Sequence, residues 1–412
     1  MLNKKKKLAI IGTVGLPAEY GGFETLASHL VENLDQEYDM TVYCSGKQYP
    51  QPDRPGHYLG ARLVYIPLQA NGVHSIPYDT WSILHALFYA DVLLILGVAG
   101  AWILPFVKLF TNKRIIISID GVEWKRDKWS RLAKAYLYWA EGMAVRYSHC
   151  DISDNESIQD YTAERYGSLS NVIEYGADHT MKVEVSREDV ARYPFLASPY
   201  AFKVCRIEPE NNLEMVLQAF SYFDRHPLVL VGNWARSAFG QNLKARYSGQ
   251  KNLILLDPIY DQREIDLLRG NASLYVHGHS AGGTNPSLVE AMYLGLPIMS
   301  FGVNYNRTTT EGKALYFDNT EGLTSLLHTT SAAQLRQVGK SMKAIANRRY
   351  KWSLIARKYQ ALVERACSIG RKGSVRPVFQ HYQEKTLTDL GAGHLASHHL
   401  FYEDTDALRS KK

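Results

Sequence analysis

The segment best suited to chemistry is a glycine-rich loop that runs into a helix, YVHGHSAGGTNPSLVEAM. Gly283 precedes Thr284 and Asn285, either of which suits a helix cap, and Pro286 suits the first helical position. Such a loop directs free backbone N–H groups at an anion. Glu290 follows about one turn into the helix, where its carboxylate can hydrogen-bond a ribose hydroxyl. The segment predicts a site for a phosphate and a sugar.

An arginine follows a predicted strand in VCRIEPENN. A guanidinium held at a strand end is suited to binding a diphosphate through two parallel hydrogen bonds. The alternative for Arg206 is a surface ion pair with Glu208 or Glu210.

A second glycine-containing loop, GTVGLPAEYGGFET, lies between the first strand and the first helix. Gly21 and Gly22 allow the backbone to approach a ligand closely, and the helix start is electropositive. The spacing is neither G-x-G-x-x-G nor that of a Walker A loop. A simple strand-to-helix turn is the alternative.

Asp120 ends a predicted strand in ISIDGVEWKRDKW, the position that faces a ligand in parallel sheets. It can orient a sugar hydroxyl or act near a reacting centre, and the alternative is a helix cap. The stretch beyond it is basic and aromatic, which suits an anionic lipid headgroup or a diphosphate, or else a solvated helix face. Its members are Trp124, Lys125, Arg126, Lys128, Trp129, Arg131 and Lys134.

Metal and thiol chemistry find little support. His277 and His279 alternate along a strand end but have no third ligand at metal spacing, which disfavours zinc. The four cysteines are far apart, which indicates buried thiols in a reducing compartment.

Short apolar runs alternate with helical patterns along the chain, which predicts an α/β protein with parallel sheets. Residues 1–185 form one such array and residues 198–350 another, so the expected ligand site is a cleft beyond the carboxyl ends of the strands. A helix is expected over 351–370. Residues 371–412 lack the alternation and are predicted to be a loosely attached tail.

The 412 residues are 46% hydrophobic and 21% charged, which excludes wholesale disorder. A net charge of +6 is too small to indicate a nucleic-acid partner.

The apolar run 92–107 is shorter than a membrane span and is interrupted by glycine and proline, so a strand, a turn and a helix are expected. Membrane contact through Trp102, Phe106 and Phe110 stays open. Lys4–Lys7 cap the first strand or attract an anionic membrane, and the apolar run after them is too short for a signal peptide.

Several of these segments together resemble a known family. EAMYLGLPI resembles the E-A-M-x-x-G-x-P segment of the retaining GT-B glycosyltransferases of family 4, and RIEPEN resembles their R-L-x-P-E-K. With GLPAEYGGFETLASHL, DGVEWKR, VGNW, LLDPIYD and HGHSAGGTNPSLVEAM in the same order, the chain resembles the bacterial rhamnosyltransferase branch. The N-terminal domain of that branch was long of unknown function.

The resemblance implies two Rossmann-like domains facing a central cleft that holds a nucleotide-diphosphate sugar. Arg206 would contact the diphosphate, and Glu290 would hold the nucleotide ribose. The phosphate and sugar loop would consist of Gly283, Thr284, Asn285, Pro286 and Ser287. Gly21 and Gly22 would close over the donor, the 351–370 helix would cross back to the N-terminal domain, and Asp120 falls where many relatives have a histidine.

Two positions depart from the family pattern. Asn211 replaces the lysine of R-L-x-P-E-K, and Gly282 replaces the first glutamate of the E-x7-E pair. We expect His279 or Asn285 to take over the sugar contact.

The expected protein is a cytoplasmic glycosyltransferase that is peripherally bound to the inner face of the cytoplasmic membrane. It would transfer L-rhamnose from dTDP-L-rhamnose, with retention, to a lipid-linked or growing surface-polysaccharide acceptor. Asp120, Arg206 and Asn211 would carry catalysis, with no metal, no cofactor and no nucleic acid partner. The alternatives are a nucleotide-sugar epimerase of the same fold and a non-catalytic nucleotide-sugar-binding partner of another transferase.

Overall fold

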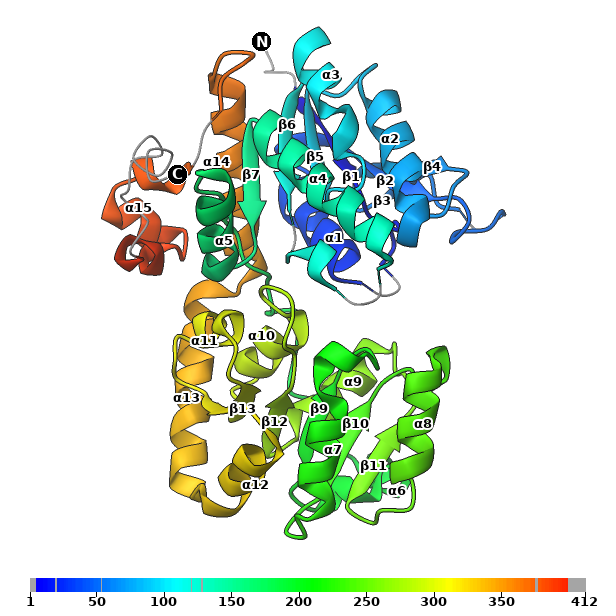
Figure 1. Ribbon diagram of the computed structural model, residues 1–412, viewed down its shortest axis with the longest axis vertical. Helices are drawn as coiled ribbons and strands as arrows, with labels where there is room; N and C mark the ends of the chain where they lie inside the picture. Colours follow the sequence, from blue (N-terminus) through cyan, green and yellow to red (C-terminus); the bar gives the residue numbers. More distant parts are fainter. Residues whose placement is uncertain are drawn as a thin grey trace. The chain divides into compact units, whose positions relative to one another are not determined.

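The structure is a computed structural model, and it describes residues 5–18, 21–52, 54–119, 121–126, 129–374 and 377–398. The chain forms two compact units (Figure 1). The described residues up to Glu174 and from Trp352 onward make the first unit, and Tyr175–Lys351 make the second. Residues 175–185, predicted as the end of the first domain, therefore group with the second unit.

The first unit is built on an eight-stranded sheet in the order β3-β4-β2-β1-β5-β6-β7-β8. Its ladders are parallel except for the short β3–β4 pair. The central strands are continuous apolar runs because both faces of a parallel sheet are covered. The strands are Lys6–Ile11 (β1), Tyr38–Ser45 (β2), His57–Tyr58 (β3), Ala61–Ile66 (β4), Val92–Leu96 (β5), Arg114–Ser118 (β6), Cys150–Ser153 (β7) and Asn171–Val172 (β8).

Helices cover both faces of this sheet (Figure 1). β1 leads through α1 toward β2, whereas α2, α3 and α4 serve crossovers in the opposite direction, so right-handed connections place these three helices on the other face. The helices are Gly22–Leu34 (α1), Ser75–Ala86 (α2), Leu104–Phe110 (α3), Arg131–Tyr147 (α4), Glu156–Tyr166 (α5), Trp352–Ser368 (α14) and Glu384–Asp389 (α15).

The C-terminal segment is packed into the first unit. On α14, Lys358 forms a fully buried ion pair with Glu174. The described part of the predicted tail buries Val378, Phe379, Leu387 and Leu395 almost completely. The prediction of a loosely attached tail is therefore wrong for residues 377–398, because a few well-spaced apolar side chains suffice to anchor a segment that lacks βαβ periodicity.

The second unit contains a six-stranded parallel sheet in the order β11-β10-β9-β12-β13-β14. Its strands are Ala201–Val204 (β9), Leu228–Val231 (β10), Leu253–Leu256 (β11), Leu274–His277 (β12), Ile298–Phe301 (β13) and Leu315–Phe317 (β14). Its helices are Arg187–Arg192 (α6), Leu213–Ser221 (α7), Ala238–Tyr247 (α8), Gln262–Gly270 (α9), Pro286–Tyr293 (α10), Asn304–Thr309 (α11), Thr320–Thr329 (α12) and Ala332–Arg349 (α13). The core between the sheet and helices α7, α8 and α12 includes Phe220, Leu230, Trp234 and Leu323.

The apolar run 92–107 has the predicted form. It comprises β5, a turn with a 3-10 segment at Ala101–Ile103, and the beginning of α3, and the strand is completely buried. Among the described residues, every helix is too short or too polar to cross a bilayer. All four cysteines are free thiols, but only Cys44 and Cys150 are fully buried.

Candidate functional site

The glycine-rich loop of the second unit joins the end of β12 to α10 as predicted. Asn285 is the helix cap, and its Oδ1 accepts hydrogen bonds from the backbone N–H of Ser287 at 3.2 Å and from the Ser287 hydroxyl at 2.8 Å. Pro286 occupies the first turn. The local sequence is sufficient for this result because capping depends on residues within one turn.

Gly282 has a backbone φ of +122° and open space where a side chain would project. A glutamate at this position would be strained, since residues with a Cβ disfavour this conformation. The glycine that departs from the E-x7-E pattern therefore permits a loop conformation that a glutamate would strain.

Contacts on both sides anchor the loop. The Ser280 N–H donates to the carbonyl oxygen of Glu210 at 2.9 Å, and the Asn212 side chain donates to the carbonyl oxygen of Gly278, also at 2.9 Å. From α11, the Asn306 amide donates to the His279 carbonyl oxygen at 2.9 Å. The segment that carries Arg206 and the segment that carries Thr284 thus form one connected substructure.

Arg206 lies just beyond β9 and its side chain is 37% exposed. Its Nε is 3.8 Å from a carboxylate oxygen of Glu208, so the predicted alternative of a surface ion pair is present, but as a loose one. The guanidinium is therefore accessible to an external anion.

Asn211 does not lie on the surface of the site. It is 2% exposed, and its side-chain amide donates to the carbonyl oxygen of Arg206 at 2.5 Å. In this structure Asn211 holds the turn after β9, which is a positioning contact.

A buried lysine on β9 lies beneath the same turn. Lys203 is fully buried, and among the described residues its Nζ has no hydrogen-bond partner. A Cβ at Gly278 would be 3.2 Å from this Nζ and would collide with the carbonyl oxygen of Asn211, so only glycine fits there. Burial lowers the pKa of Lys203. The sequence gives little sign of this group, because a lone lysine in a strand is more often at a surface.

Glu290, predicted to hold a ribose, has two basic neighbours that sequence reasoning missed. Arg269 on α9 forms an ion pair with one carboxylate oxygen, and His179 Nε2 is 3.3 Å from the other. Burial would raise the pKa of Glu290, but Arg269 and His179 more than offset burial and hold it below its ordinary value. Glu290 is therefore ionised and remains an acceptor.

The two histidines at the end of β12 stack on each other, with ring centroids 4.4 Å apart and an angle of 8° between the planes. His277 is fully buried, and burial followed by the nearby Lys203 lowers its pKa well below the ordinary value. Its neutral ring is thus a packing element beneath His279. In the described part of the chain, no group of three or more histidine, cysteine and carboxylate side chains is placed to hold a metal ion.

In the first unit, Gly21 and Gly22 begin α1. The carboxylate of Glu24 fills the space where a side chain at Gly21 would project, and it accepts a hydrogen bond from the Val14 N–H at 2.6 Å. Gly21 is therefore required for loop closure by Glu24, whatever else it binds. Asp120 lies outside the described residues.

The basic and aromatic stretch is largely engaged within the protein. Trp124 donates to the Tyr161 hydroxyl at 3.0 Å, and both Trp129 and Arg126 contact Glu123 at 3.0 Å. Lys128 lies outside the described residues. Lys125 is exposed beside the rings of Trp124 and Tyr161, Arg131 is exposed at the beginning of α4, and Lys134 is partly exposed.

Taken together, the second unit presents an accessible guanidinium, a capped helix start and an ionised carboxylate near the carboxyl ends of parallel strands. This arrangement is suited to a phosphorylated ligand that also carries hydroxyl groups. The two parallel-sheet units are Rossmann-like, and together they define the GT-B glycosyltransferase fold.

Comparisons with known proteins agree with this class. Residues 5–178 match the family described as "Domain of unknown function (DUF1972)", and residues 187–311 match "Glycosyl transferases group 1". In a chain of GT-B fold, a segment that matches the DUF1972 family thus precedes a segment that matches the group 1 glycosyltransferases. A search of curated protein sequences found no match.

Solved structures with this fold include sucrose-phosphate synthase from Thermosynechococcus elongatus, with a TM-score of 0.73 and 17% identity over 88% of this chain and 100% of that one. HepE from Anabaena, in complex with UDP, has a TM-score of 0.66 and 14% identity over 87% and 100%. A glycosyltransferase from Rickettsia africae has a TM-score of 0.64 and 13% identity over 89% and 100%. At these identities the likeness establishes the fold.

Proposed function

We propose that the protein is a retaining hexosyltransferase that moves L-rhamnose from dTDP-L-rhamnose to a lipid-linked or growing surface-polysaccharide acceptor at the inner face of the cytoplasmic membrane. The assignment of a nucleotide-sugar donor rests on one observation. Arg206, the start of α10 and the ionised Glu290 belong to one substructure of the segment that matches the group 1 glycosyltransferases. The rhamnosyl part rests on the motif resemblance, and no metal or cofactor takes part.

In the proposed donor complex, Arg206 binds the diphosphate through its exposed guanidinium. The backbone N–H groups of Gly283 and Thr284 and the hydroxyl of Ser287 lie along the loop that would face the phosphates and sugar. Glu290 accepts a ribose hydroxyl, while Arg269 and His179 keep it ionised. His279 and Asn285 are the nearest candidates for the sugar contact that Gly282 lacks.

The proposed reaction breaks the bond between the anomeric carbon and the diphosphate oxygen and forms a bond from the acceptor hydroxyl oxygen to that carbon on the same face. The acceptor proton goes to the departing diphosphate oxygen. Arg206 and the helix-start N–H groups stabilise the developing charge, and Asn211 holds the Arg206 turn. Asp120 orients the sugar or the acceptor, and Gly21 and Gly22 let their loop close over the donor.

A donor panel tests this function. The full-length protein is incubated with dTDP-L-rhamnose, dTDP-glucose, UDP-glucose and GDP-mannose, each with and without a bacterial membrane lipid extract. We expect release of dTDP from dTDP-L-rhamnose that depends on the extract, together with a rhamnosyl product that keeps the anomeric configuration of the donor. Turnover of a donor without extract would indicate the epimerase, and tight donor binding without turnover under either condition would indicate the non-catalytic partner.

A further inference from the structure

The helices on one face of the first sheet carry apolar side chains toward solvent as well as toward the core. On α2, Trp81 and Leu84 lie on the outer side, and Phe88 follows at the same helical spacing with 89% of its surface exposed. On α4, Leu132 and Trp139 are seven residues apart, and Leu132 is 85% exposed. An outer apolar stripe on each of two neighbouring helices is unusual for a surface in contact only with water.

The short helix α3 continues this surface. Its exposed members are Phe106, Leu109 and Phe110, the last of which is 73% exposed, and α3 packs beside α4. We call the outer surface of α2, α3 and α4 the aromatic face. It covers one side of the first unit's sheet (Figure 1).

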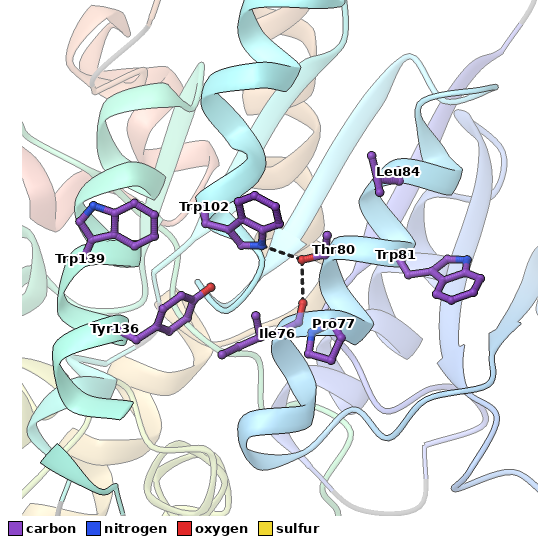
Figure 2. A pocket seen from close by; sticks show the side chains of 8 residues that line it. All are labelled: Ile76, Pro77, Thr80, Trp81, Leu84, Trp102, Tyr136 and Trp139. Carbon is purple, nitrogen blue, oxygen red and sulfur yellow. Dashed lines mark hydrogen bonds between the residues drawn. The ribbon is translucent and has the colours of Figure 1, made fainter. Parts of the chain in front are cut away.

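The aromatic face contains a pocket of about 580 Å³ between α2, the 3-10 turn after β5, and α4. Figure 2 shows Trp102 above the pocket, Tyr136 and Trp139 on the α4 side, and Ile76, Trp81 and Leu84 along α2. Its volume is in the range of small-molecule sites.

The polar side-chain groups of Trp102, Thr80 and Tyr136 at this pocket are hydrogen-bonded to the protein itself. The Trp102 indole N–H donates to the Thr80 hydroxyl at 2.9 Å, and that hydroxyl donates to the Ile76 carbonyl oxygen at 2.8 Å (Figure 2). The Tyr136 hydroxyl donates to the Ala99 carbonyl oxygen at 2.5 Å. A ligand therefore gains little by bringing its own hydrogen-bonding groups, and the pocket suits a hydrocarbon chain.

The exposed charged side chains of helices α2, α3 and α4 are all positive. Their two carboxylates, Asp79 and Glu141, are 3% and 2% exposed, and Glu141 is paired with Arg165. Arg131 and Arg146 on α4 are exposed, and Lys108 on α3 is half-buried. Among the charged residues of these three helices, those exposed to solvent are cations, and an apolar surface with such cations is complementary to an anionic lipid surface.

We propose that the aromatic face docks on an anionic lipid bilayer and that its pocket takes one hydrocarbon chain of a bilayer lipid. This inference rests on the proposed function, because it places the glycosyltransferase at the membrane that holds its acceptor. The aromatic side chains enter the interfacial region, and the arginines meet the phosphate groups. No step of sugar transfer is needed for this docking.

Vesicle partitioning tests the docking without any sugar donor. The full chain is mixed with vesicles of phosphatidylglycerol and phosphatidylcholine, and with vesicles of phosphatidylcholine alone. We expect strong partitioning only with phosphatidylglycerol. Because all three side chains are highly exposed, the triple variant Phe88→Ser, Phe110→Ser, Leu132→Ser keeps its fold and loses at least tenfold in partition coefficient. The matched control is Tyr222→Ser, an exposed aromatic on the second unit.

The charge component has its own variant. Arg131→Gln with Arg146→Gln is expected to lower the partition coefficient roughly tenfold or more, since each cation near an anionic surface contributes about a fivefold change. Arg236→Gln, an exposed arginine of the second unit, should leave it unchanged.

Tryptophan quenching tests the pocket separately. Lipids brominated on the acyl chain should quench fluorescence of the bound wild type, and the variant Trp81→Phe, Trp102→Phe, Trp139→Phe should lose this quenching. Trp352→Phe, which removes a buried tryptophan, should retain it.

Absence of partitioning on anionic vesicles, or equal partitioning by the triple serine variant, would overturn the docking. A concentration-dependent dimer broken by the triple variant, with no vesicle binding, would assign the face to a second copy of the chain. Vesicle binding together with failure of the donor panel would refute the proposed activity while leaving the docking intact. Donor turnover with a detergent-dispersed acceptor but no vesicle binding would refute the docking while leaving the proposed activity intact.

Discussion

One carboxylate oxygen of Glu290 lies 3.3 Å from Nε2 of His179, although the two residues are on different elements and far apart in sequence. The other oxygen is paired with Arg269, a guanidinium that is only 2% exposed. Glu290 therefore has two roles. Its carboxylate neutralises a buried cation, and it presents an ionised hydrogen-bond acceptor at the first turns of α10. A single substitution there should have both a stability effect and a ligand effect.

Replacing Glu290 by glutamine is expected to weaken dTDP binding roughly tenfold and to lower the free energy of unfolding by about 2 kcal/mol. The affinity falls because a charged acceptor is lost, and the stability falls because Asp266 is then the one ionic partner left to Arg269 among the residues that the structure describes. Calorimetric titration and thermal unfolding measure the two effects. The control Glu321→Gln, at an exposed position on α12, should change neither. Unchanged dTDP affinity with reduced stability would make Glu290 a purely structural partner of Arg269.

Arg206→Ala is expected to lower kcat/KM by a factor on the order of 10²–10³ without changing the thermal midpoint. The stability should persist because the side chain is exposed and its ion pair with Glu208 is loose. Arg206→Lys should fall between the wild type and the alanine variant, since lysine keeps the charge but loses the two-pronged geometry. Steady-state transfer assays measure this series, with Arg236→Ala as control. Near-normal transfer by Arg206→Ala would show that Arg206 does not bind the diphosphate.

Lys203→Met is expected to raise the free energy of unfolding by about 1–3 kcal/mol, because a buried amine that has no hydrogen-bond partner among the described residues is replaced by an apolar chain of similar length. The same variant should lose donor affinity, since the Lys203 amine lies under the Gly278 loop, where a Cβ on Gly278 would meet both Lys203 Nζ and the carbonyl oxygen of Asn211, the residue that stands in place of the family's lysine. Urea unfolding and titration with dTDP measure the two effects. A variant that is more stable and binds dTDP normally would assign Lys203 no part in the site.

The carboxyl group of Asp79, which lies beneath the aromatic face, should make the free energy of unfolding depend on pH. Burial raises the pKa of Asp79 from 3.8 to about 8, and its hydrogen bond from the Gly100 N–H offsets only part of this. Below about pH 4 the carboxyl is protonated in both states. As the pH rises to 8 the unfolded state ionises first, so stability falls, by up to about 5 kcal/mol for the full shift.

Asp79→Asn should therefore be more stable than the wild type at pH 8 and nearly equal to it at pH 4. Urea unfolding at one-unit intervals from pH 4 to 8 gives the comparison, and Asp39→Asn at an exposed position on β2 is the control. Parallel stability curves for wild type and Asp79→Asn would show that the carboxyl ionises normally in the folded protein.

Much of the α10 region could be predicted from the sequence, because its determinants are local. The cap at Asn285, the proline in the first turn and the strand before the loop each depend on residues within a few positions of one another. The same holds for the strand and turn of the apolar run 92–107. The hydrogen-bond partners of individual side chains could be predicted less completely. The sequence suggests that the side chains of Trp124 and Trp129 are available to a ligand, but their indole N–H groups donate to Tyr161 and Glu123.

The sequence by itself determined the alternation of strands and helices, the α/β class and the residues that could meet a phosphorylated sugar. Those features follow from periodicity and from capping, which act over a few residues. Only the tertiary structure decided that Arg269 and His179 flank Glu290, that Lys203 is buried without a hydrogen-bond partner among the described residues, and that Trp81, Trp102 and Trp139 border one pocket. These relationships join residues from different elements. Their geometry depends on how helices pack against the sheet, which no short stretch of sequence encodes.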